Sequence, residues 1–348
     1  MTSASHKTVV VSDFHISNGA KYSWFRRPCP ENAAAMFTSI SNDSSVDELV
    51  LLGDVFDLWL YPLDVVPWTV NKISNKYPLI TKALQMCVQN IANVYYLRGN
   101  HDMGVAAKDL QAFSSGGRQI QLIDPDSYNT KHHGRLHIEH GHAVDMFNAR
   151  DTATDTIGGY PLGFFITRLA ATAADQSAVW RELTALLQAL GLTHKALVTA
   201  GITVPTMGVF FVDAIITLLE KLAGVDDSAR IRFSDPTLDK KYMVGDIKRH
   251  YNTLYTTWLA RYPDYEEFLN TMLAGLLPSG LDWYANKLFS ENPALKVVVM
   301  GHTHFAKTVG GYYNDGCWCV PSTLGQGKAT PSYVQIVGGS PTLIYWKP

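Results

Sequence analysis

The first part of the chain alternates short apolar runs with segments of helical periodicity. Runs rich in β-branched and aromatic residues predict buried strands, and apolar residues three or four positions apart predict helices between them. This alternation is typical of an α/β sheet. We expect strands at Thr8–Ser12, Glu48–Leu52, Asn93–Leu97 and Leu136–Glu139, and helices at Glu31–Ile40 and Ile80–Ile91.

From about residue 151 to residue 292 the strand pattern stops and helical periodicity continues throughout. We therefore expect a helical insertion, 151–292, in a domain formed by residues 1–150 and 293–348. The sheet pattern resumes at Lys296–Met300, and Tyr312–Val320 and Tyr333–Tyr345 are expected as closing antiparallel strands. The expected helices of the insertion are Leu162–Ala174, Ala178–Leu190, Val209–Leu222, Lys241–Ala260, Tyr265–Leu277 and Leu281–Leu288.

Charge and cysteine content limit the classes of function. Charged residues make up 17% of the 348 residues and the formal net charge is -2, so no overall basic field favours a nucleic-acid partner. The four cysteines are too sparse and irregular for a disulfide framework, and Cys317 and Cys319 are interpreted as small buried side chains. With no room for a signal peptide before the first strand, we expect a cytoplasmic protein.

The most apolar window is Gly201–Leu219, which contains Pro205 and Asp213. These interruptions make it a poor transmembrane span. A buried helix or a lipid-facing groove fits the window better, so peripheral membrane contact through the insertion remains open.

Polar residues follow the predicted strands at their carboxyl ends, where an α/β sheet gathers side chains into one crevice. Each of them has an ordinary alternative role as a helix cap, a turn residue or a core histidine. Together, carboxylates, imidazoles and one amide oxygen suit transition metals better than calcium, and their number suits two ions that share a carboxylate. These residues are Asp13, His15, Asp54, Asn100, His140, His302 and His304.

Five motifs contain these residues, and in them the chain resembles the calcineurin-like metallophosphoesterases. The resemblance covers roughly residues 8–150 and 295–325. It implies a sandwich of two β-sheets flanked by helices, and hydrolysis of phosphoric esters with two divalent or trivalent ions of Mn, Fe or Zn. The motifs are Asp13-Phe14-His15, Gly53-Asp54-Val55-Phe56-Asp57, Gly99-Asn100-His101-Asp102, His140-Gly141-His142 and Gly301-His302-Thr303-His304.

The resemblance also implies a role for each residue. Asp54 would bridge the two ions, one held by Asp13, His15 and His304 and the other by Asn100, His140 and His302. A metal-bridging hydroxide would attack phosphorus, since coordination lowers the pKa of water. His101 would protonate the leaving oxygen, and Asp57 would orient His101. Arg98 is a candidate for substrate contact. His142 either contacts the substrate or supports the metal ligands, or it is equally well explained as a loop histidine.

The run Gly53–Trp59 and the helical insertion resemble the branch that includes UDP-2,3-diacylglucosamine hydrolases, which split a pyrophosphate and shelter acyl chains under a helical cap. The chain departs from that branch in carrying His101 where the branch has arginine, and in its longer insertion. Apolar residues such as Phe164, Phe165, Phe210 and Phe211 would suit an acylated substrate, but helices that pack on each other explain them as well.

The leading hypothesis is a phosphoesterase acting on a phosphomonoester, a phosphodiester or a pyrophosphate. A nuclease is disfavoured because the chain has no basic stripe. A non-catalytic scaffold that binds a partner through the insertion is the alternative from another class. The substrate, the metals and the oligomeric state stay open.

Overall fold

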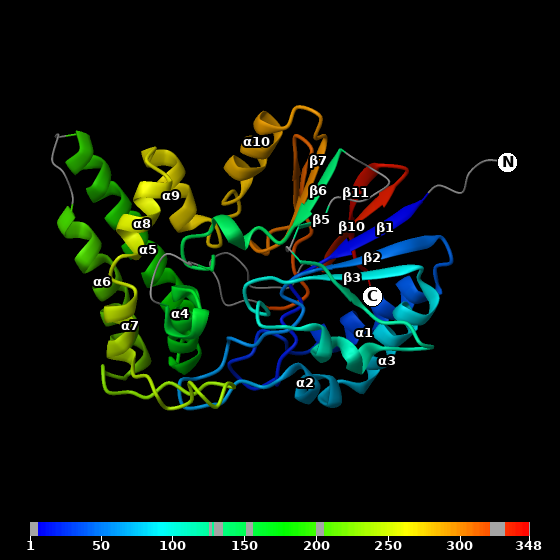
Figure 1. The fold of residues 1–348 in the computed structure, drawn as a ribbon, viewed down its shortest axis with the longest axis horizontal. Coiled ribbons are helices and arrows are strands. Elements are labelled where there is room, and N and C mark those ends of the chain that lie inside the picture. Colours follow the sequence, from blue (N-terminus) through cyan, green and yellow to red (C-terminus); the bar gives the residue numbers. More distant parts are fainter. Residues whose placement is uncertain are drawn as a thin grey trace.

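Two mixed β-sheets form the centre of the fold (Figure 1). A computed structural model describes residues 6–124, 127–128, 135–150, 156–199, 205–320 and 331–347. The first sheet has the strand order β11-β10-β1-β2-β3-β4 and the second β5-β6-β7-β9-β8. The strands are β1 (Lys7–Val11), β2 (Val46–Leu52), β3 (Asn93–Leu97), β4 (Gln121–Leu122), β5 (Ser127–Tyr128), β6 (Leu136–Glu139), β7 (Val297–Met300), β8 (Lys307–Val309), β9 (Tyr312–Asn314), β10 (Ser332–Val337) and β11 (Ser340–Tyr345).

Helices cover the outer faces of both sheets and also form a separate lobe, which Figure 1 shows on the left. The first sheet is covered by α1 (Cys29–Asn42) and α3 (Pro78–Asn90), with α2 (Val70–Lys76) beside them, and the second by α10 (Asp282–Glu291). The lobe contains α4 (Leu162–Thr172), α5 (Gln176–Thr199), α6 (Pro205–Ala223), α7 (Val244–His250), α8 (Leu254–Arg261) and α9 (Tyr265–Leu273). Short 3₁₀ turns lie at Ala107–Phe113, His142–Val144 and Ile157–Gly159. This arrangement confirms the predicted class, a two-sheet α/β sandwich flanked by helices.

The central strands are apolar on both faces because both faces are buried. Successive side chains of a strand point to opposite sides of the sheet. In β1, Val10 lies in the sandwich interior, whereas Val9 and Val11 pack toward α1 and α3. In β7, Val299 lies in the same interior and Val298 packs toward α10. The continuous β-branched runs of the sequence are therefore strands that separate two cores.

Parallel pairing places the important strand ends on one side of the sandwich. The strands β1, β2 and β3 are parallel neighbours, and β6 is parallel to β7. Their carboxyl ends therefore meet at a single edge, as the sequence predicts.

Three details of the predicted elements are wrong. The expected helix Lys241–Ala260 is two helices, because α7 ends before Tyr251, which is fully buried and donates from its hydroxyl to the carbonyl of Tyr160. The insertion is not helical throughout, since a non-helical segment from Gly224 to Met243 includes a bridge between Arg230 and Met243. The expected strand Tyr312–Val320 ends at Asn314.

Arg168 ties the helical lobe to the first half of the chain. Its side chain in α4 is fully buried, and its guanidinium donates to the carbonyls of Pro62, Val65 and Arg232. Buried cations are normally paired, and here carbonyl oxygens take the place of a carboxylate. The division into domains stays a prediction, and its boundary at residue 151 lies outside the described residues.

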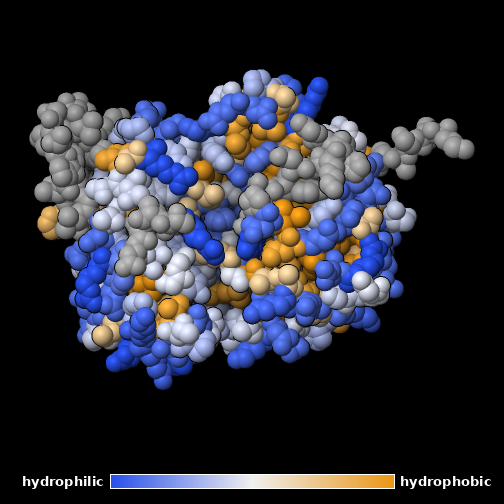
Figure 2. Space-filling view, viewed as in Figure 1, coloured by the Kyte–Doolittle hydropathy of each residue, from blue (hydrophilic) through white to orange (hydrophobic). Residues whose placement is uncertain are grey.

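The apolar residues of the insertion pack mainly on one another. Phe164, Phe165 and Phe211 are buried in one core, whereas Phe210 is 66% exposed. On the face shown in Figure 2, hydrophilic and neutral residues cover most of the coloured part of the lobe, and hydrophobic residues form only small patches there. Among the described helices none is both long and apolar enough to cross a membrane. Residues 201–204 of the most apolar window lie outside the described part of the chain.

Candidate metal centre

The chain turns sharply at the strand ends that carry the predicted ligands. Left-handed backbone is uncommon for residues other than glycine and is found where the surrounding structure enforces it, often at functional sites. Backbone hydrogen bonds hold these turns, for example from the His15 amide to the Asp54 carbonyl at 2.9 Å. Positive φ angles occur at Asp13 (56°), His15 (53°), Asp54 (49°), His302 (68°) and His304 (65°).

Three of the predicted ligands converge on one point. The Nε2 atoms of His15 and His304 are 3.1 Å apart, and Asp13 Oδ1 lies 3.7 Å and 3.3 Å from them respectively. Asp13 is fully buried and its Oδ1 has no hydrogen-bond partner among the described residues. Buried polar atoms normally have partners, so this group fits a bound cation.

A second set converges beside the first. His302 Nδ1 lies 3.1 Å from Asn100 Oδ1, and His140 Nε2 lies 3.4 Å from Asp54 Oδ2. The same Asp54 oxygen is 3.6 Å from His15 Nε2, which places Asp54 between the two sets. The structure thus brings all seven predicted ligands together, and which ion each would hold stays a prediction.

Glycines make this close approach possible. A Cβ atom on Gly99 would collide with the Asp54 carboxylate, and a Cβ atom on Gly301 would collide with the Asp13 carboxylate. Both glycines stand directly before a predicted ligand, Asn100 and His302. The glycines of the motifs therefore leave room for the carboxylates.

The buried carboxylates and imidazoles shift one another's pKa values. Burial opposes a charge on His140, but Asp54 and Asp13 outweigh it and raise the pKa of His140 to about 10. Burial also opposes a charge on Asp54, but His140, His101 and His15 hold its pKa well below the usual range. Cations bound here would replace the protons on these imidazoles as the partners of the carboxylates.

Neighbouring groups orient the imidazoles. His140 Nδ1 donates to the Leu52 carbonyl at 2.8 Å, and His302 Nε2 lies 2.9 Å from Asp145 Oδ2. Metal-binding histidines usually hold their second nitrogen in this way. The sequence leaves Asp145 two roles, support of the fourth motif or, slightly favoured, a cap of the following helix; Asp145 accepts from the Phe147 amide and also contacts His302.

His101 and Asp57 form the predicted pair. His101 Nδ1 lies 2.9 Å from Asp57 Oδ1, and the Trp59 ring stacks on the imidazole at 4.8 Å between centroids. Asp57 Oδ2 also lies 3.4 Å from His15 Nδ1, a contact that the sequence does not reveal. The Asp57 carboxylate therefore contacts both His101 and the predicted metal ligand His15.

The sequence model of one known family matches this chain. The calcineurin-like phosphoesterase model covers residues 6–182, about half of the 348 residues. The chain belongs to the calcineurin-like phosphoesterase family. Membership implies metal-dependent hydrolysis of phosphoric esters, and the buried Asp and His groups can hold the metals that such enzymes use. A comparison with curated proteins finds no match.

The match stops before the fifth motif of this calcineurin-like phosphoesterase. His302 and His304 lie well beyond residue 182, and β7 brings them to the same edge as β1 and β2. The tertiary structure thus brings the residues of the fifth motif to the candidate metal centre across the insertion.

A small cavity of about 70 Å³ lies over the metal centre. Its floor includes Asp54, Asn100, His101, His302 and His304, and its walls are largely apolar. No lysine or arginine is among the described residues that line it. The other lining residues come from several elements, including α4 and α5: Trp24, Asp145, Phe147, Asn148, Gly163, Ile166, Thr167, Trp180, Leu183, Gly275 and Leu276.

The two residues predicted to contact substrate are not among those lining this cavity. Arg98 Nη2 forms an ion pair with Asp124 at 3.0 Å. The His142 ring lies 5.5 Å from His140, next to the second set of ligands, where burial and His140 lower its pKa. The predicted substrate contact of each residue therefore stays a prediction.

Asp102 is a buried support that the sequence interpretation did not assign. Its carboxylate accepts from the amides of Gly99 (2.7 Å) and Val55 (2.9 Å) and from the hydroxyl of Tyr96. It therefore joins the turn after β2 to the turn after β3. Its position within the third motif, directly after His101, is the signal that could have identified it.

Asp102→Ala is expected to lower the free energy of unfolding by roughly 2 to 4 kcal/mol, because two buried amides lose their acceptor. Denaturant unfolding with a chelator present measures this without the contribution of bound metal. Asp124→Ala is the control, since Asp124 is exposed and its loss should change stability by less than about 0.5 kcal/mol. Equal stability of the two variants would contradict the assigned role of Asp102.

Asp145→Ala is expected to weaken binding of the ion at Asn100, His140 and His302 by about 10- to 100-fold, because His302 loses the group that orients it. Competition with a chromogenic chelator measures both metal affinities. Asp264→Ala is a matched control, since Asp264 also accepts from backbone amides but lies at α9, outside the centre. Unchanged affinity for both ions in Asp145→Ala would show that Asp145 only holds its own loop.

Proposed function

We propose that the protein is a two-metal phosphoesterase that cleaves esters joining one phosphoryl group to an apolar alcohol. The observation that carries the proposal is the convergence of seven buried ligand side chains under a cavity with apolar walls. Two metal ions, when bound, lower the pKa of water for attack on phosphorus and neutralise the phosphoryl oxygens.

The chain's own residues have distinct roles in this proposal. Asp54, which lies between the two ligand sets, would be the ligand that both ions share. His101 lines the cavity, and its contact with Asp57 through Nδ1 leaves Nε2 as the nitrogen that protonates the leaving oxygen. Asp57 keeps the imidazole in the required orientation.

The cavity wall supports the substrate class. With no cationic side chain among its described lining residues, the metals supply the positive charge for the phosphoryl group. The apolar side chains of Ile166, Leu183 and Leu276 favour an apolar alcohol, because its transfer from water into the cavity is favourable. A sugar or a nucleoside would lose its hydrogen bonds to water there. A monoester is favoured over a diester because the cavity is far smaller than the roughly 300–1,000 Å³ of most small-molecule sites.

Hydrolysis of an acylated pyrophosphate is the second candidate. The resemblance to the UDP-2,3-diacylglucosamine hydrolase branch and the apolar lobe favour it. Such a substrate is far larger than the cavity, so most of it would lie outside the cavity in this arrangement. A scaffold that binds a partner through the lobe is a weaker alternative, because it gives no reason for seven converging ligands.

A substrate panel with Mn²⁺, Zn²⁺ or Fe²⁺ tests the proposal. Monoesters of apolar alcohols are expected to have a higher kcat/KM than glycerol phosphate, nucleotide sugars or bis-aryl phosphates. Ile166→Asp should reduce this preference without removing metal, since Ile166 lines the wall and not the floor. Preference for a nucleotide sugar would favour the second candidate, and absence of hydrolysis with both ions bound would favour the scaffold.

A further inference from the structure

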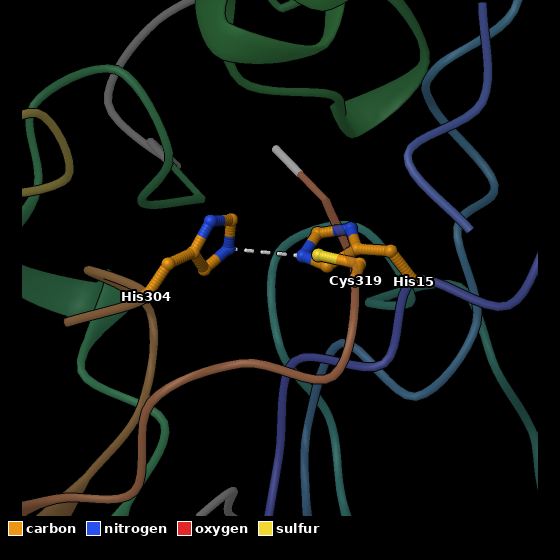
Figure 3. A group of neighbouring side chains, drawn as sticks. All are labelled: His15, His304 and Cys319. Atoms are coloured by element: carbon orange, nitrogen blue, oxygen red, sulfur yellow. Dashed lines mark hydrogen bonds between the residues drawn. The ribbon is translucent and has the colours of Figure 1, made fainter. Parts of the chain in front are cut away.

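A cysteine lies beside the first set of ligands. Cys319 is fully buried, and its Sγ and a ring nitrogen from each of His15 and His304 all lie within 4.8 Å of one another. Figure 3 shows the thiol and both imidazoles directed toward a common region. Cysteine sulfur and imidazole nitrogen are both common ligands of zinc.

Backbone hydrogen bonds of the residues before and after Cys319 fix its position beside the first set of ligands. After β9 the chain leaves the sheet at Gly316, whose φ is +78°, and the Trp318 amide then donates to the Asp13 carbonyl at 2.9 Å. The next anchor is the Val320 amide, which donates to the Trp24 carbonyl at 3.0 Å. Cys319 is therefore held between a contact to the first motif and a contact to a residue of the cavity wall.

Free cysteines are often no more than small buried side chains. Cys87 is such a case, because it is fully buried in α3 and its thiol donates to the Phe37 carbonyl in the core. Cys319 differs in its surroundings, which include two imidazole nitrogens only 3.1 Å apart and the Asp13 Oδ1 atom, which has no hydrogen-bond partner within the described part of the chain. These atoms independently indicate a cation at this position.

We propose that Cys319 supplies a thiolate ligand to the ion held by Asp13, His15 and His304. The proposal rests on the metal centre of the proposed function. On binding, the S–H bond breaks, a sulfur–metal bond forms and the proton passes to solvent, with no change of oxidation state. Thiolate favours zinc over manganese, so this position becomes selective for zinc while the Asn100, His140 and His302 position keeps only nitrogen and oxygen ligands.

Cobalt substitution tests the bond directly, because a thiolate on Co²⁺ produces charge-transfer absorption in the near ultraviolet. The metal-free full-length chain is loaded with Co²⁺, and the wild type and Cys87→Ser are expected to show this band. Cys319→Ser should lack it but keep the visible ligand-field bands of cobalt held by nitrogen and oxygen. Cys319→Ser should also bind Zn²⁺ at least about tenfold more weakly, with nearly unchanged affinity for Mn²⁺.

A band that persists in Cys319→Ser, or its absence from wild-type protein that holds Co²⁺, overturns the proposal. If Cys319→Ser does not fold, X-ray absorption of the zinc-loaded wild type decides, since a thiolate ligand gives a sulfur neighbour at about 2.3 Å. Only nitrogen and oxygen neighbours would overturn the proposal. Wild type that binds both ions and hydrolyses phosphoesters without a sulfur signal would refute the role of Cys319 alone, whereas loss of all metal binding would refute the proposed function as well.

Discussion

Replacing Asp54 by Asn is expected to abolish phosphoester hydrolysis and to prevent the binding of two ions per chain. Asp54 lies between the two ligand sets, with Oδ2 at 3.6 Å from His15 Nε2 and 3.4 Å from His140 Nε2. The amide group would bring neither the negative charge nor the second lone-pair oxygen that a bridge requires. Metal ions contribute several kcal/mol to such reactions, so kcat/KM should fall by about 10³-fold or more.

Asn is the informative replacement because it preserves the fold around the site. Asp54 Oδ1 accepts from the His101 amide at 2.7 Å, and the carbonyl oxygen of Asn can keep that bond. Metal content by mass spectrometry and kcat/KM for an aryl phosphate measure the effect, and Asp124→Asn is the exposed control. Two bound ions and near-normal turnover in Asp54→Asn would refute the bridging role.

Replacing His101 by Asn is expected to lower kcat by about 10²- to 10⁴-fold for esters of weakly acidic alcohols, because general acid catalysis supplies about that much. Esters of acidic phenols should lose much less, because their leaving oxygen departs without a proton. His101 belongs to neither ligand set, so both ions should still bind. The imidazole acts at the cavity while the Asp57 carboxylate holds Nδ1.

The dependence of the rate on the acidity of the leaving group distinguishes proton donation by His101 from a role in positioning the substrate or stabilising the transition state. Rates for a series of phenyl and alkyl phosphates with wild type, His101→Asn and His137→Asn provide the comparison; His137 lies in β6, outside the residues that line the cavity. A uniform loss for every leaving group in His101→Asn would mean that His101 only stabilises the transition state or positions the substrate.

Asp57→Asn is expected to affect both His101 and the first set of metal ligands, because the Asp57 carboxylate contacts His101 and His15. The contact to His101 predicts slower turnover, and the 3.4 Å contact to His15 predicts some loss of affinity for the first ion as well. From the sequence alone we expect metal content to be nearly unchanged. Loss of both ions would show that Asp57 supports the whole centre and not mainly His101.

Much of the centre could be predicted because its parts are local in the sequence. The runs before Asp13, Asp54 and Asn100 show where strands end, and parallel strands gather their carboxyl ends at one edge. The breaks at Tyr251 and Asn314 could not be predicted, since distant contacts produce them. Tyr251 reaches the Tyr160 carbonyl, and Asn314 donates to the Gly301 carbonyl at 2.6 Å.

The amino-acid sequence by itself determined the order of strands and ligands, because side-chain periodicity and strand-end chemistry depend on neighbours along the chain. Only the tertiary structure decided which supports reach the ligands. Asp145 contacts His302, which lies 157 positions later in the sequence. Cys319 lies beside His15 because the neighbouring amides of Trp318 and Val320 donate to the carbonyls of Asp13 and Trp24, which are far away in the sequence. Such pairings depend on the path of the backbone through space, which no local pattern records.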